Sequence, residues 1–132
     1  MKAATREWVD KAEADYAAAL LLRRSRRKHS RDIVCFHLQQ CVEKYLKDRL
    51  ADAGIAFPRT HDLERLLDLA LVVEPLWASL RPAVAALTDY AVEVRYPRYT
   101  ASPAEARPLL RTTGRIRGLI RQRLGCESKG LG

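Results

Sequence analysis

The feature that most constrains how this chain can fold is the helical repeat of its apolar residues. In five segments apolar side chains recur every three or four positions, and no stretch alternates apolar and polar residues for long, as a strand would. The sequence therefore predicts an all-α fold, an up-and-down bundle of about five helices joined by short connections. The expected helices cover residues 5–27, 30–53, 62–73, 76–94 (or 80–94) and 103–124.

Residues that cap helices define the expected helix starts. Thr5 is the expected N-cap of the first helix and Thr60 that of the third. Pro82 suits only the first turn of a helix, which favours Ser79 as the N-cap of the fourth. The fifth helix begins at residues 102–105, Ser-Pro-Ala-Glu, which combine a cap, a proline at the first position and a capping-box glutamate.

Composition and cysteine spacing indicate the class of protein. Apolar residues make up 48% of the 132-residue chain and charged residues 30%, as in a folded globular protein. We expect a single domain over residues 1–125 and a disordered tail over residues 126–132. Cys35 and Cys41 would lie about 9 Å apart on one helix, too far for a disulfide, which favours the reducing cytoplasm. The longest apolar run, residues 16–22, is far too short to span a membrane.

Positive charge is concentrated in two stretches of the chain, whose net charge is +8. Residues 23–31 hold six basic residues and no acid, and residues 107–132 hold seven basic residues and one acid, Glu127. Such a concentration suits an anionic partner, for example a nucleotide, RNA or an acidic protein face. The alternative is that residues 23–31 and 107–123 are solvated surface, and that the 18 arginines against 6 lysines reflect coding bias.

The second expected helix carries a stripe of polar side chains beside its apolar row, spaced i, i+3, i+7 and i+10. The stripe offers hydrogen-bonding groups and two cations to a ligand. The alternative is a solvated face held by weak i,i+4 ion pairs, Glu43 with Lys47 and Lys44 with Asp48. The stripe consists of His37, Gln40, Lys44 and Lys47.

A second candidate lies where the fourth helix is expected to end. Arg95 and Tyr96 precede Pro97, and Tyr99 follows closely. A guanidinium beside aromatic rings can hold a phosphate and stack a base. The alternative is that Arg95 bonds the last carbonyls of its helix while the tyrosines enter the core.

His61 and Asp62 are secondary candidates. A neighbouring carboxylate can orient an imidazole, but a histidine at a helix start is commonly exposed or part of the cap. The three histidines are scattered and no pair of cysteines or histidines has metal-ligand spacing, so we expect neither a metal nor a cofactor.

Three segments follow one another along the chain: residues 36–47 (FHLQQCVEKYLK), 60–63 (THDL) and 87–97 (LTDYAVEVRYP). In this order they resemble the motifs of HEPN domains, the nucleotide-binding domains of higher eukaryotes and prokaryotes. The resemblance covers about residues 5–124. It implies an all-α bundle that is commonly dimeric. Prokaryotic members are often encoded beside a small nucleotidyltransferase, and some pairs act as toxin and antitoxin.

Many HEPN toxins are metal-independent ribonucleases with an Arg-x4-6-His motif, and this sequence departs from that pattern. No histidine follows Arg95. Arg31 and His37 have the spacing but lie at the start of the second helix, away from the usual place of the nuclease motif. The sequence therefore leaves open whether the protein is an enzyme.

The first interpretation is a cytoplasmic, homodimeric HEPN protein that binds a nucleotide or phosphate-rich ligand and acts with a nucleotidyltransferase. One alternative is a ribonuclease toxin in which His37 acts as general base or acid and Arg31 stabilises phosphate charge. A second alternative is a protein-interaction module. The expected ligand contacts are His37, Gln40, Lys44, Lys47, Arg95, Tyr96 and Tyr99, with His61 and Asp62 as secondary candidates.

Overall fold

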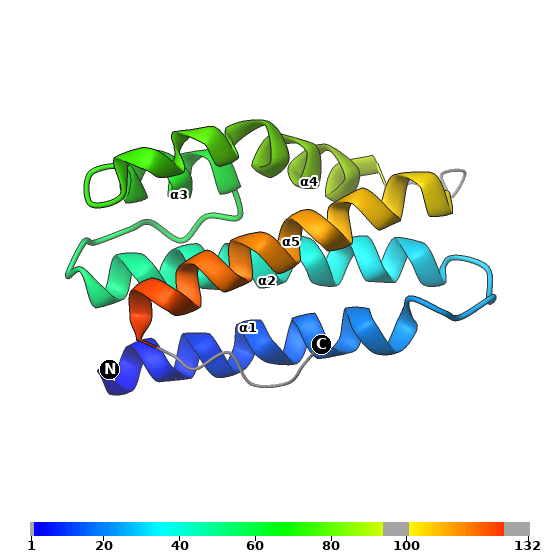
Figure 1. Ribbon diagram of the computed structural model, residues 1–132, viewed down its shortest axis with the longest axis horizontal. Helices are drawn as coiled ribbons and strands as arrows, with labels where there is room; N and C mark the ends of the chain where they lie inside the picture. The colour runs from blue at the N-terminus through cyan, green and yellow to red at the C-terminus, as the bar shows by residue number, and fades with distance from the viewer. Residues whose placement is uncertain (1, 94–100, 126–132) are drawn as a thin grey trace.

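The computed structural model describes residues 2–93 and 101–125 (Figure 1). Over these residues the chain forms five α-helices, one 3-10 helix and no strand, so the predicted all-α fold is confirmed. Successive long helices run in opposite directions (Figure 1). The elements are α1 (Ala3–Leu22), α2 (Ser30–Asp52), α3 (Leu63–Ala70), the 3-10 helix η1 (Pro75–Leu80), α4 (Arg81–Glu93) and α5 (Pro103–Leu124).

Helix α2 is the centre of the bundle, because α1, α3, α4 and α5 all pack against it (Figure 1). Its apolar side chains are therefore buried on several sides rather than along one stripe. Burying one leucine or valine fully stabilises a fold by about 1.5–3 kcal/mol, so this helix supplies a large share of the core. Its side chains that are at most 1% exposed include Leu38, Val42, Tyr45, Leu46 and Leu50.

The expected start and end of the last helix are confirmed. The Ser102 Oγ accepts a hydrogen bond from the Glu105 N–H at 3.2 Å, and the Glu105 carboxylate accepts one from the Ser102 N–H at 3.0 Å. Pro103 occupies the first helical position. Gly125, with φ of 74°, ends α5 in the left-handed conformation that a side chain would disfavour.

Both predicted bounds of the first helix, residues 5 and 27, were wrong. Helix α1 begins at Ala3 and ends at Leu22, five residues short of the expected end. Thr5 is not a cap: it lies inside the helix and is fully buried, and its hydroxyl has no hydrogen-bond partner in the part of the chain that the structure describes. Packing of this face against the bundle has therefore overridden the local preference of threonine for a cap.

Two other expected caps were also wrong. Asp62, rather than Thr60, caps α3, because its carboxylate accepts from the N–H groups of the second and third helical residues. The Thr60 hydroxyl accepts instead from the Asp62 N–H at 3.1 Å. Ser79 lies within η1, where its hydroxyl donates to the Leu76 carbonyl at 3.2 Å. Pro82 is the second residue of α4, a first-turn position where its missing N–H costs no helical hydrogen bond.

Cys35 and Cys41 are both free and buried on α2. Burial raises the pKa of Cys35 to about 11, and burial also raises the pKa of Cys41. Both are therefore thiols at neutral pH and act as small core side chains. In the described part of the chain, no helix is long and apolar enough to cross a membrane.

Candidate functional site

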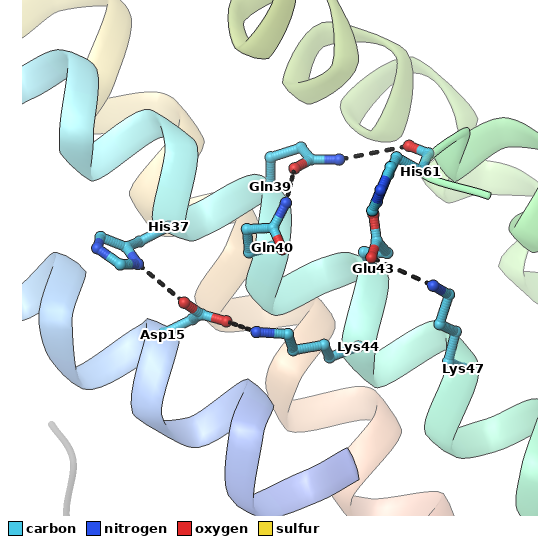
Figure 2. A network of polar contacts seen from close by, with 8 residues as sticks. All are labelled: Asp15, His37, Gln39, Gln40, Glu43, Lys44, Lys47 and His61. Atoms are coloured by element: carbon cyan, nitrogen blue, oxygen red, sulfur yellow. Dashed lines mark hydrogen bonds and ion pairs between the residues drawn. The ribbon is translucent and has the colours of Figure 1, made fainter. Parts of the chain in front are cut away.

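The expected polar stripe of α2 meets α1 at a buried carboxylate, Asp15 (Figure 2). One oxygen of Asp15 accepts a hydrogen bond from Nδ1 of His37 at 2.8 Å. The other accepts one from the ammonium group of Lys44. We call these three residues the Asp15 cluster; it joins two stripe residues through a partner that the sequence pattern did not indicate.

A second carboxylate on α2 organises the rest of the stripe (Figure 2). Glu43 is only 3% exposed, and it accepts from Nδ1 of His61 at 2.8 Å and from Nζ of Lys47 at 3.3 Å. The amide nitrogen of Gln39 donates to the His61 carbonyl at 3.4 Å, and Gln40 donates to the Gln39 amide oxygen at 2.9 Å. This Glu43 cluster ties the loop before α3 to the centre of α2.

Each imidazole in these clusters is oriented by its carboxylate. A carboxylate only accepts hydrogen bonds, so the neutral ring donates from Nδ1 and keeps Nε2 free to accept. The side chain of His61 is 75% exposed and that of His37 is 26% exposed. The two carboxylates balance the two lysines, so this face of α1 and α2 offers directed hydrogen bonds rather than net positive charge.

The structure brings together the stripe and His61, and it separates Asp62 from them. Asp62 caps α3 instead of orienting the imidazole beside it in the sequence. Lys47 is 7% exposed and also lies over the Trp8 ring, 5.4 Å from its centre, so it contributes to packing as well as charge. The remaining expected contacts lie outside the described residues, as does the predicted tail over residues 126–132; those contacts are Arg95, Tyr96 and Tyr99.

Of the two expected ion pairs within α2, one is confirmed and one was wrong. Glu43 and Lys47 pair as expected. Lys44 turns to Asp15 instead of Asp48. Asp48 is fully buried, and neither of its carboxylate oxygens has a hydrogen-bond partner among the described residues. Burial, with repulsion from nearby carboxylates, raises the pKa of Asp48 to about 9, so this side chain is protonated at neutral pH.

Arg31 and His37, the expected nuclease pair, contact different elements. Arg31 donates from Nε to the carbonyl of Ala101, just before α5, at 2.9 Å. His37 contacts Asp15 on α1. One chain therefore does not turn both side chains toward a common partner. In the described part of the chain, no group of histidine, cysteine and acidic side chains is placed to hold a metal ion.

A partly buried ion-pair network that the sequence reasoning missed joins α1, α2 and α5 at Glu13. Its carboxylate accepts two hydrogen bonds from Arg117, both 2.6 Å, one from Arg121 at 3.0 Å, and one from the Tyr45 hydroxyl at 2.5 Å. Burial alone would raise the pKa of Glu13, but the hydrogen bonds from Arg117 and Tyr45 outweigh it and hold the pKa below its ordinary value. No local pattern marks this network, because Glu13 and Arg117 are 104 positions apart.

Comparison with known proteins agrees with the fold and with the expected family. The sequence model described as the HEPN domain matches residues 5–123, which is nearly the whole chain. Comparison with curated proteins and with solved structures gave no significant match. Because the match spans well over half of the chain and the fold is all-α, this protein belongs to the HEPN family.

Proposed function

We propose that this HEPN-domain protein binds a nucleotide or a related phosphate-rich ligand on the α1–α2 face and acts with a nucleotidyltransferase, in a toxin–antitoxin pair. The observation that supports ligand binding is the Asp15 cluster. A single buried carboxylate, Asp15, lies between an imidazole and an ammonium group of α2 and holds one with each of its oxygens (Figure 2). Groups that are already oriented lose little conformational freedom when a ligand binds.

The chemistry of the cluster suits a nucleotide. The free Nε2 of His37 can accept a hydrogen bond from a ribose hydroxyl or a base amino group. Lys44 uses one of its three N–H donors for Asp15, which leaves two for a phosphate oxygen, and its side chain is 21% exposed. Arg95, Tyr96 and Tyr99 belong to the same proposal on the strength of the sequence pattern.

Two exposed apolar side chains of α2 support a protein contact beside this face. Ile33 is 45% exposed and Phe36 is 41% exposed, although α2 is the central helix. The Phe36 ring meets the His37 ring edge to face, 5.7 Å apart. We infer that this surface contributes to a homodimer. Sedimentation at micromolar concentration should give twice the 15.0 kDa chain mass, and a monomer at high concentration would exclude this arrangement.

Ligand binding is tested by titrating ATP in a calorimeter. The Lys44→Met variant keeps the aliphatic stem but removes the charge, and His37→Gln removes the free ring nitrogen. Losing a hydrogen bond to a charged group should weaken binding about tenfold or more. The control is Lys11→Met, an exposed lysine of α1 outside both clusters. Equal ATP affinity in wild type and Lys44→Met would exclude the Asp15 cluster as the site.

A second candidate function is metal-independent RNA cleavage, and the contact between Asp15 and His37 is the observation that favours it. A carboxylate behind an imidazole is an arrangement used in general acid–base catalysis. Arg31 of the same chain bonds Ala101, so an arginine that stabilises the phosphate would have to come from a second copy. We expect no cleavage of cellular RNA by the purified protein under metal chelation. Cleavage that disappears in His37→Ala would establish the nuclease instead.

A further inference from the structure

A small cavity at the end of the bundle brings together the two basic stretches of the sequence. It lies between the turn that joins α1 to α2 and the first turns of α5, and its volume is about 170 Å³. Every charged side chain that lines the cavity is an arginine, and no carboxylate is among the lining groups. The five arginines of this arginine pocket are Arg23, Arg24, Arg26, Arg31 and Arg107.

Hydrogen bonds hold the walls of the arginine pocket in place. The backbone of Ala101 is bonded on both sides, because its N–H donates to Asp32 at 2.6 Å and its carbonyl accepts from Arg31 at 2.9 Å. Within the turn, the Ser25 and Ser30 hydroxyls share a hydrogen bond of 2.8 Å. The turn and the start of α5 are thus fixed relative to each other before any ligand arrives.

Most of the cations in the pocket have no partner of opposite charge. The side chains of Arg23, Arg24, Arg26 and Arg107 form no ion pair within the described residues. Gathering like charges around one cavity is unfavourable, because each repels the others. An anion bound among them would relieve that repulsion, whereas the paired charges of the α1–α2 face have no such need.

The size and surroundings of the pocket indicate the shape of the anion. Pockets that enclose a drug-sized ligand are about 300–1,000 Å³, so this one is too small for a whole nucleotide. It continues into a shallow groove along α5 that shares Arg23 with the pocket and adds the exposed side chains of Arg111 and Arg115. A short, strongly charged chain fits a small pocket that opens into a basic groove.

We propose that the arginine pocket binds an oligophosphate, a chain of two or more adjacent phosphoryl groups, with the chain extending into the groove along α5. The planar fork of each guanidinium suits two oxygens of one phosphoryl group. Such a chain occurs both in inorganic polyphosphate and in the triphosphate of a nucleotide. This site is separate from the Asp15 cluster and holds whether or not that cluster binds a nucleotide.

The test is calorimetric titration of the full chain with phosphate, pyrophosphate and tripolyphosphate in 0.15 M salt. Charges more than about 8 Å away are largely screened there, so only arginines close to the ligand contribute. Affinity should rise with the number of phosphoryl groups. Arg26→Ala and Arg107→Ala should each weaken tripolyphosphate binding about tenfold or more. The Arg26→Lys variant keeps the positive charge but loses the planar guanidinium, so its affinity for tripolyphosphate should lie between those of wild type and Arg26→Ala.

Matched controls separate a built site from general attraction. Arg65→Ala removes the same charge from the exposed face of α3 and should change the affinity less than twofold. Lys44→Met should also leave tripolyphosphate binding unchanged, which distinguishes this pocket from the proposed nucleotide site. Equal weakening by Arg65→Ala, or no binding of tripolyphosphate at millimolar concentration, would overturn the proposal.

Two further ligands identify the source of the phosphate chain. ATP is titrated into the Lys44→Met variant, in which the proposed nucleotide site is weakened. ATP that binds this variant as tightly as tripolyphosphate, or more tightly, indicates that the arginine pocket accepts a nucleotide triphosphate. ATP that binds more weakly indicates inorganic polyphosphate. A 12-nucleotide RNA without a terminal triphosphate that binds where tripolyphosphate does not would overturn the proposal in favour of a nucleic-acid surface.

Discussion

The two halves of α5 use the same residue type in opposite ways. In the C-terminal half, Arg117 and Arg121 turn inward and share the carboxylate of Glu13, whose side chain is 18% exposed. In the N-terminal half, Arg107 and Arg111 are exposed and form no ion pair within the described residues. In the sequence, the two halves of α5 form one continuous basic stretch and cannot be told apart. Only the position of an acid on a neighbouring helix decides which arginines hold the fold together and which remain available to a ligand.

The largest expected effect on stability is at Glu13, the partner of the paired arginines in the C-terminal half of α5. Glu13→Gln keeps the shape of the side chain but leaves Arg117, which is 9% exposed, as a buried cation without a counter-charge. Breaking such a pair from one side costs about 3–5 kcal/mol. Urea denaturation should show a loss of that size. Glu7→Gln, an exposed change on the same helix, should have almost no effect. A loss below about 1 kcal/mol for Glu13→Gln would mean that the network contributes little to stability.

A smaller effect of opposite sign is expected at Asp48, a buried acid that lacks the partners of Glu13. Leaving a buried polar group without a hydrogen bond costs about 1–3 kcal/mol. Asp48→Leu has a similar volume and should increase the free energy of unfolding by that amount at pH 7. Thermal unfolding checks the sign directly. A lower melting temperature would show that Asp48 has a partner, for example a buried water.

The same two acids should respond to pH in opposite directions. The pKa of Glu13 is lowered in the folded state, so its stabilisation is present at neutral pH and is lost as the pH falls through that lowered value. The pKa of Asp48 is raised from 3.8 to about 9, so the folded state binds a proton that the unfolded state has released. Between pH 3.8 and about pH 9, the unfolded and folded pKa values of Asp48, the free energy of unfolding should therefore fall as the pH rises. Asp48→Leu should flatten this slope in urea titrations from pH 5 to pH 9, and an unchanged slope would assign the dependence to another group.

The smallest effect is expected at the unpaired end of α5. Replacing Arg107 and Arg111 together by alanine removes two exposed cations and should change the free energy of unfolding by no more than about 0.5 kcal/mol. At low salt the change should be stabilising, because repulsion among the arginines is weaker. A loss comparable to that of Glu13→Gln would show that these arginines are structural, and the contrast between the two halves would fail.

Features written in neighbouring residues were predictable. The capping box at the start of α5 and the pair of Glu43 with Lys47 each depend on residues three or four positions apart, and both are present. Helical spacing alone also places the four members of the α2 stripe on one face of the helix.

Features that depend on packing were not predictable. Thr5 has the chemistry of a cap but is buried, and Lys44 had a local partner yet binds Asp15 on another helix. The arginine pocket combines residues 23–31 with Arg107, and only the fold brings them together. Sequence spacing carries no information about such contacts, because the turn geometry and the crossing of α5 over α2 determine them.

The contact between Glu13 and Arg117 also bears on the order in which the bundle assembles. Helices α1 and α2 are consecutive and can pair across a short turn. The contact between Glu13 and Arg117 instead joins residues that are 104 positions apart, so its formation closes a loop that contains most of the chain. Contacts between distant segments carry a larger entropic cost of closure before they form. We therefore expect α5 to dock after the rate-limiting step of folding. In stopped-flow kinetics Glu13→Gln should then increase the unfolding rate and leave the folding rate nearly unchanged. Slower folding of this variant would instead show that α5 is already docked in the folding transition state.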